Sequence, residues 1–174
     1  MTTIDEGRLR FIFGDVWQID KYDECTFYRK RICALDETKA VDFAGIGPGP
    51  AVYLIEVKDF RNHRIENKPK FKNQDLVLAV ASKVRDSVAG LIALRRNHPG
   101  PNPDAFCRAA EEIADPRKTI KIILWLEEDM HQSKPALSTL ANQLKSKIGW
   151  VSARVFVVET ATHGVPDLQV QDRP

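Results

Sequence analysis

Runs of apolar residues of strand length predict the framework of this chain. They are rich in β-branched and aromatic residues, which favour strands. They cover residues 39–47, 51–60, 119–127 and 152–160. Residues 8–18 are also apolar-rich and are predicted as strand or irregular structure. The GPGP sequence at 47–50 must turn, because proline lacks an amide donor and glycine permits unusual backbone angles. The first two strands are therefore expected to form an antiparallel hairpin.

Apolar positions three or four residues apart predict helices between the strands. The longest helix is expected over 73–97, where one apolar stripe runs along its length. The stripe consists of Val77, Val80, Val84, Val88 and Leu91. Shorter helices are expected over 104–114 and 134–148. Residues 23–35 are predicted as a first helix, although their Thr, Phe, Tyr and Ile residues also favour strands.

This order of elements predicts an α/β (α+β) fold. A central mixed sheet would be flanked by helices on both faces, and the early hairpin would supply its antiparallel part. A length of 174 residues suits one domain over 1–174, and a hydrophobic content of 43% is enough for a core. Residues 161–174 are expected to form a loose tail.

Composition narrows the classes of protein. No apolar run reaches the roughly 18 residues of a membrane-spanning helix, and the N-terminus lacks the pattern of a signal peptide. The cysteines Cys25, Cys33 and Cys107 include no CxxC pair, which predicts a reducing cytoplasm and buried structural thiols. A net charge of +2 excludes a strongly basic coat for nucleic acid but not a local basic patch. The sequence contains no histidine pair at zinc-ligand spacing, no P-loop and no GxSxG elbow.

The strand 51–60 carries two charges where burial is expected. Side chains alternate between the faces of a strand, so Glu56 and Lys58 share a face with Leu54 and Phe60. Burying charges in a core is costly unless they are paired or bind something. The pair therefore lies at the rim of the sheet or builds a site. The alternative is that both charges decorate a solvated face, as most charged residues do.

A third charge belongs to the preceding strand. Asp42 is a lone carboxylate in an apolar stretch, and a hairpin that turns at 47–50 brings it close to Glu56. Two carboxylates on adjacent strands make an oxygen site of the kind that Mg²⁺ (or Mn²⁺) prefers, with water and phosphate completing the shell. A nearby ammonium group can orient a hydroxide or offset charge on phosphate. The alternative is that Asp42 caps a turn.

The pattern Asp42…Glu56-Val57-Lys58 resembles the PD-(D/E)xK nuclease superfamily, which has the restriction-endonuclease-like fold. Its members carry an aspartate in one strand and E-x-K in the next, in an αβββαβ core. The resemblance covers about residues 17–160 and extends to a group of small uncharacterised bacterial proteins of this fold. Val41 stands where the family name has proline.

The resemblance implies a metal-dependent hydrolase of phosphodiester bonds in nucleic acid, with DNA as the expected substrate. Asp42 and Glu56 would bind Mg²⁺, and Lys58 would assist the attacking water. The family often adds an acidic residue from its first helix. Glu24 is the candidate for that role, and Asp23 is the alternative.

The helix after E-x-K often lends a polar residue to the site in this superfamily. Lys83 is the candidate here, because it borders the apolar stripe. The alternative is a lysine at the edge of a helix that extends its ammonium group into solvent.

A basic stretch follows the strand that carries Glu56. It is expected to contact phosphates, with Phe71 as a base-stacking residue, or else to be a solvated loop. Its basic residues are Arg61, Arg64, Lys68, Lys70 and Lys72.

Two further functions compete with a nuclease. The same fold could be a non-catalytic nucleic-acid-binding module or a protein-interaction subunit. Because no separate DNA-reading domain is present, a homodimer or a larger complex is expected.

Overall fold

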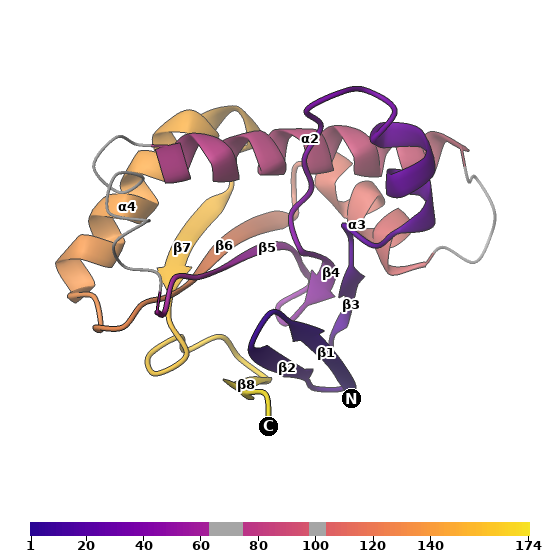
Figure 1. Ribbon diagram of the computed structural model, residues 1–174. Helices are drawn as coiled ribbons and strands as arrows, with labels where there is room; N and C mark the ends of the chain where they lie inside the picture. The colour runs from indigo at the N-terminus through magenta and orange to yellow at the C-terminus, as the bar shows by residue number, and fades with distance from the viewer. Residues whose placement is uncertain (63–74, 98–103) are drawn as a thin grey trace.

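The computed structural model describes residues 1–62, 75–97 and 104–174, and a five-stranded mixed sheet lies at its centre (Figure 1). The strands β3, β4 and β5 pair antiparallel, whereas β5, β6 and β7 pair parallel. In sheet order the strands are β3 (Gln18–Lys21), β4 (Phe43–Gly47), β5 (Ala51–Asp59), β6 (Thr119–Glu127) and β7 (Arg154–Val158). The mixed α+β architecture and the hairpin at 47–50 are confirmed.

Three α-helices cover one face of this sheet: α2 (Asp75–Asn97), α3 (Ala105–Ala114) and α4 (Lys134–Lys147) (Figure 1). The predicted stripe of α2 packs into the core on this side, together with Leu54 and Leu124 of the sheet. Asp104 and Ser133 cap the starts of α3 and α4, because their side chains accept hydrogen bonds from backbone amides of the first turn.

A second, three-stranded antiparallel sheet covers the other face of the central sheet. Its strands are β1 (Thr2–Glu6), β2 (Leu9–Phe13) and β8 (Leu168–Asp172). Phe11 of β2 packs edge-on against Phe43 and Trp125, with ring centroids 5.0 and 5.1 Å apart. The expectation of helices on both faces is therefore wrong for the parts of the chain that the structure describes. The alternation in LRFIF gives β2 one apolar face, which serves as cover in place of a helix.

The segment 161–174, expected to be a loose tail, contains β8. Leu168 pairs with Phe13 and Val170 with Phe11, so this strand closes the edge of β2. Leu168 and Val170 alternate with glutamines, and this pattern presents a narrow apolar face to the core.

The expected first helix over 23–35 is shorter than predicted. Helical residues run over 26–32, and Tyr28–Ile32 has π-helical hydrogen bonding. Two hydrogen bonds confine this segment: the backbone amide of Tyr22 donates to Asp42 O, and the side-chain hydroxyl of Tyr28 donates to Thr38 O.

The cysteines are less uniformly buried than expected. Cys107 is buried, Cys25 is half-buried and Cys33 is exposed, and all three thiols are free.

Candidate active site

The hairpin register brings Asp42 and Glu56 together beneath α2. Phe43 pairs with Ile55, so Asp42, directly before β4, lies opposite the Glu56 position. The Asp42 carboxylate accepts a hydrogen bond from Val57 N at 2.6 Å through Oδ2. Asp42 is 6% exposed and Glu56 is 1% exposed. The carboxylate that precedes β4 and the carboxylate of β5 thus both lie in the interior on the helix-covered side.

Two lysines converge on the Glu56 carboxylate. Lys58 Nζ lies 2.5 Å from Glu56 Oε1, and Lys83 Nζ of α2 lies 2.7 Å from the same oxygen. Lys83 Nζ also lies 3.5 Å from Asp42 Oδ1. The Lys58 and Lys83 side chains are 28% and 21% exposed, so the cluster opens to solvent on the lysine side.

The protonation of this cluster follows from its burial. Burial raises the pKa of Glu56 to about 7, and the neighbouring Asp42 charge adds to the rise against the opposing effect of Lys58 and Lys83. For Lys83, burial lowers the pKa, but the charges of Glu56 and Asp42 outweigh it and the net shift is upward. In this partly enclosed space Glu56 therefore binds a proton more readily than an exposed glutamate, whereas Lys83 keeps its proton more firmly than an exposed lysine.

Some carboxylate oxygens near this cluster lack partners in the described residues. Glu56 Oε2 and Asp23 Oδ1 are buried without a hydrogen bond there. Burial raises the pKa of Asp23, and the Asp42 charge raises it further. A buried acceptor without a donor is unfavourable, so these oxygens are suited to water or a cation.

The donor set fits a hard divalent cation that keeps most of its waters. Mg²⁺ is commonly held by one or two carboxylates, with water and phosphate oxygens in its other positions. Asp42 and Glu56 supply two carboxylates of this kind. In the described ranges, no group of three or more His, Cys, Asp or Glu residues could hold a metal ion. The metal would therefore depend on oxygens from solvent and substrate.

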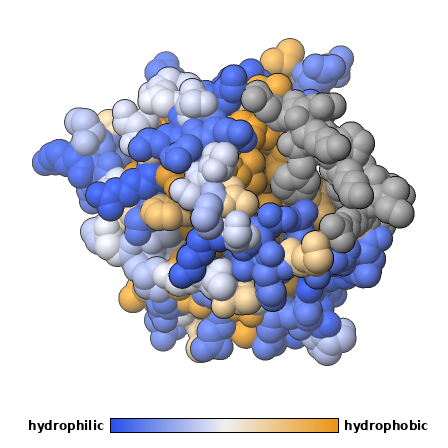
Figure 2. Space-filling view, turned by 90° about the vertical axis from the view of Figure 1, so that its left-hand side faces the viewer, coloured by the Kyte–Doolittle hydropathy of each residue, from blue (hydrophilic) through white to orange (hydrophobic). Residues whose placement is uncertain are grey.

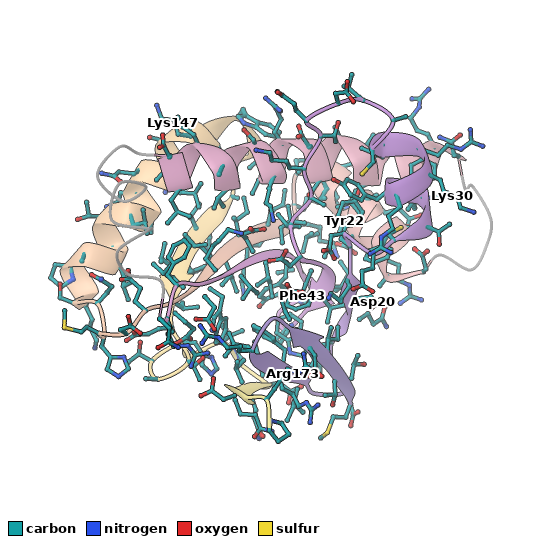
Figure 3. The ribbon with its side chains drawn as sticks, viewed as in Figure 1. Asp20, Tyr22, Lys30, Phe43, Lys147 and Arg173 are labelled. Atoms are coloured by element: carbon teal, nitrogen blue, oxygen red, sulfur yellow. The ribbon has the colours of Figure 1, made fainter. Side chains whose placement is uncertain are left out.

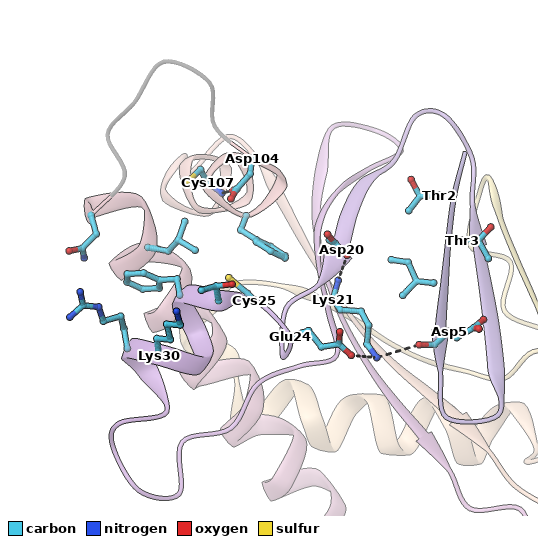
Figure 4. Close-up of a pocket in the computed structure, with 17 residues that line it drawn as sticks. Thr2, Thr3, Asp5, Asp20, Lys21, Glu24, Cys25, Lys30, Asp104 and Cys107 are labelled. Carbon is cyan, nitrogen blue, oxygen red and sulfur yellow. Dashed lines mark hydrogen bonds and ion pairs between the residues drawn. The ribbon is translucent and has the colours of Figure 1, made fainter.

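Glu24, the first candidate for a third acid, pairs with Lys21 and not with a residue of this cluster. Its Oε1 lies 2.9 Å from Lys21 Nζ, which also pairs with Glu6, and its side chain is half exposed. Glu24 lines a separate cavity of about 1300 Å³, which is bounded by β1, β3, the helical turn at 26–32, the end of α2 and the start of α3 (Figure 4). Of the two candidates, it is Asp23, the alternative, whose pKa is raised by the Asp42 charge.

The predicted nucleic-acid contacts lie mostly outside the described residues. Only Arg61 is described, and its guanidinium group pairs with Asp59 and Asp172 at 2.8 and 2.7 Å. These ion pairs connect the end of β5 to β8. The guanidinium group of Arg61, which was expected to contact phosphate, therefore already has two carboxylate partners. The predicted contacts outside the described residues are Arg64, Lys68, Lys70 and Lys72, as is Phe71.

Sequence reasoning missed the residues that fix the chain next to Asp42. The buried Ser87 Oγ of α2 accepts a hydrogen bond from Val41 N at 2.9 Å. Tyr22 N donates to Asp42 O at 2.8 Å, and Asp86 accepts from Lys39 N at 3.1 Å. Ser87 follows Lys83 by one helical turn, so its polar side chain on the inner face was a signal in the sequence.

We expect Ser87→Ala to lower the free energy of unfolding by about 1–3 kcal/mol, because Val41 N would lose its acceptor in a buried place. Urea unfolding measures this loss. Ser82→Ala on the same helix is the control, and its half-buried serine should change the value by about 0.5 kcal/mol or less. Equal losses in the two variants would contradict a specific role of Ser87.

Comparison with known proteins assigns no family. No family model and no solved structure matches the chain. The cysteine–tRNA ligase of Neisseria meningitidis serogroup A / serotype 4A is 30% identical over a match that covers 84% of this chain and 24% of the ligase. The chain thus spans about a quarter of the length of this relative. None of the helices in the described ranges is long and apolar enough to cross a membrane.

Proposed function

We propose that this chain is a metal-dependent nuclease that hydrolyses phosphodiester bonds of nucleic acid, with DNA as the expected substrate. The observation that carries the proposal is the convergence of Asp42, Glu56, Lys58 and Lys83 at one partly open place. Buried charges are retained at a cost, and such perturbed groups concentrate at functional sites.

Each residue has a distinct role in this proposal. Asp42 and Glu56 would hold Mg²⁺ (or Mn²⁺), which when bound supplies positive charge and lowers the pKa of a water molecule. Lys58 is the more exposed lysine, so it would orient the attacking water and offset charge on the phosphate. Lys83 would stay charged and hold the two carboxylates in place.

A non-catalytic nucleic-acid-binding module is the second candidate. It is favoured by the pairing of Glu56 with both lysines and by the lack of a three-ligand metal group in the described ranges. The relative named above is a tRNA ligase, so RNA belongs among the substrates to be tested. The three free thiols support a reducing compartment such as the cytoplasm.

Cleavage assays test the nuclease proposal. Labelled single- and double-stranded DNA and RNA would be incubated with wild-type protein and Mg²⁺, Mn²⁺ or EDTA, beside Asp42→Asn. Cutting should require the metal and should disappear in the variant, because the carboxamide removes a negative charge that the metal needs. If folded wild-type protein cuts none of the substrates, the binding module becomes the better proposal.

A further inference from the structure

Lys83 reaches the candidate active site from a different element than the acids do. It belongs to α2, whereas Asp42 precedes β4 and Glu56 belongs to β5. Its Nζ lies 2.7 Å from Glu56 Oε1 and 3.5 Å from Asp42 Oδ1. Lys58, the other lysine of the cluster, pairs with Glu56 alone. Among the described residues, Lys83 is therefore the cation that both carboxylates share.

Asp42 depends on Lys83 for its counter-charge. Asp42 Oδ2 accepts a hydrogen bond from Val57 N, so Oδ1 is the oxygen that faces the ammonium group. No other ion pair of Asp42 occurs in the part of the chain that the structure describes. In Figure 3, Tyr22, whose amide donates to Asp42 O, lies towards α2, and Phe43 lies towards the small sheet. A carboxylate at this depth retains little hydration, so its counter-charge contributes to the stability of the fold.

The surroundings of Lys83 keep its charge effective. Its side chain is half-buried, and Val80 and Val84, on either side of it in α2, are fully buried. Figure 2 views the molecule from the side at which β5 ends and α2 begins in Figure 1, and hydrophobic surface is visible there beside hydrophilic side chains. A charge that solvent screens weakly acts strongly on other charges a few ångströms away.

The same charge opposes the binding of a metal ion. A divalent cation held by Asp42 and Glu56 would share both carboxylates with Lys83, and like charges that share ligands repel. The ammonium group is part of the chain and is therefore present at every metal concentration. Any metal ion at these carboxylates thus competes with a resident cation.

We propose that Lys83 is a built-in counter-ion, which stabilises Asp42 and Glu56 in the metal-free chain and lowers the affinity of these carboxylates for a divalent metal. The inference deepens the proposed function and rests on it for the identity of the metal, Mg²⁺ or Mn²⁺. Lys83 is a positioning residue in this role, because it acts on the carboxylates and not on the substrate. It sets the metal concentration that the site requires.

Metal binding measured without substrate tests this inference. The full chain is titrated with Mn²⁺ at pH 8, where protons compete little for the carboxylates, and free Mn²⁺ is followed by electron paramagnetic resonance. Lys83→Met keeps the length of the side chain and removes its charge, so it should bind Mn²⁺ about tenfold more tightly than wild type, or better. Lys83→Arg restores the charge and should return the affinity to within about threefold of wild type.

Unfolding in urea at the same pH gives a second readout. In EDTA, Lys83→Met should unfold at a lower urea concentration than wild type, because Asp42 and Glu56 lose the cation that they share. Addition of Mg²⁺ should raise the midpoint of Lys83→Met more than that of wild type, because a ligand that binds the folded state more tightly stabilises it more.

The matched control removes a positive charge elsewhere on the same helix. Arg85 pairs with Asp86 at 2.7 Å, and its side chain is 65% exposed. Arg85→Met should leave the Mn²⁺ affinity within about twofold of wild type, because solvent screens an exposed charge. Mn²⁺ binding by Lys83→Met that is no tighter than that of wild type, or an equal gain in Arg85→Met, would overturn the inference.

Cleavage assays separate this inference from the proposed function. If Lys83→Met gains Mn²⁺ affinity but neither it nor wild type cuts any substrate, the nuclease proposal fails and the counter-ion role stands. If wild type cuts with metal but Lys83→Met binds Mn²⁺ no more tightly, the nuclease proposal stands and the inference fails. If neither protein binds Mn²⁺ at millimolar concentration, the inference also fails, because removal of the ammonium group would have exposed no metal site.

Discussion

Between about pH 4 and pH 8, we expect wild-type protein to lose about 3 kcal/mol of unfolding free energy relative to a Glu56→Gln variant. Burial and the Asp42 charge raise the pKa of Glu56 to about 7 in the folded protein, from 4.5 for an unperturbed glutamate. The folded state therefore holds this proton more tightly than the unfolded state does. Its stabilising effect is complete below pH 4.5 and is lost as the pH rises through 7.

Urea unfolding followed by circular dichroism, in EDTA at each pH, measures this difference. The control is Glu37→Gln, which replaces an exposed carboxylate, and its pH profile should follow that of wild type. Parallel profiles for wild type and Glu56→Gln would mean that Lys58 and Lys83 keep Glu56 ionised throughout. The pKa of Glu56 in the folded protein would then not be raised above that of an ordinary glutamate.

Replacement of Lys58 by alanine should lower the rate of phosphodiester cleavage by roughly 10²–10³-fold at saturating metal. The removed ammonium group is the one with the greater exposure, and Glu56 keeps Lys83 as a partner at 2.7 Å. The fold and the metal-binding carboxylates should therefore be preserved, and the metal concentration for half-maximal rate should change little.

Initial rates over a metal titration distinguish this effect from a loss of metal binding. Lys39→Ala is the matched control, because Lys39 is an exposed lysine three residues before Asp42. It should cleave at about the wild-type rate. If Lys58→Ala cleaves normally and only needs more metal, Lys58 would act through Glu56 instead of on the reacting groups.

The parts of the fold with strong apolar patterns were predictable from the sequence. The strands 51–60 and 119–127 and the helix 73–97 carry long runs or stripes, and these agree with β5, β6 and α2. The covering sheet was not predictable, because β2 and β8 are short strands that pair across most of the chain. Local pattern contains little information about such distant partners.

The candidate site shows the same division. The proximity of Asp42 and Glu56 follows from a hairpin with a turn at 47–50, and this local geometry was deducible. The different surroundings of Asp23 and Glu24 were not deducible, because both residues lie in the irregular turn before the helical residues 26–32, where no regular periodicity fixes their directions. The contact of Ser87 with Val41 depends on how α2 docks onto the sheet, and this is a tertiary property.

The pairing of β8 with β2 has a consequence for biosynthesis. A ribosome makes β2 long before residues 168–172, which leave the exit tunnel after the strands of the central sheet. Until then, one edge of β2 has no partner in β8, and the rim of the core around Phe13 lacks Leu168. Nascent chains with an open strand edge are prone to pair with one another or to be held by chaperones. Closure of this edge therefore waits until the ribosome has released β8, well after the central sheet has been made.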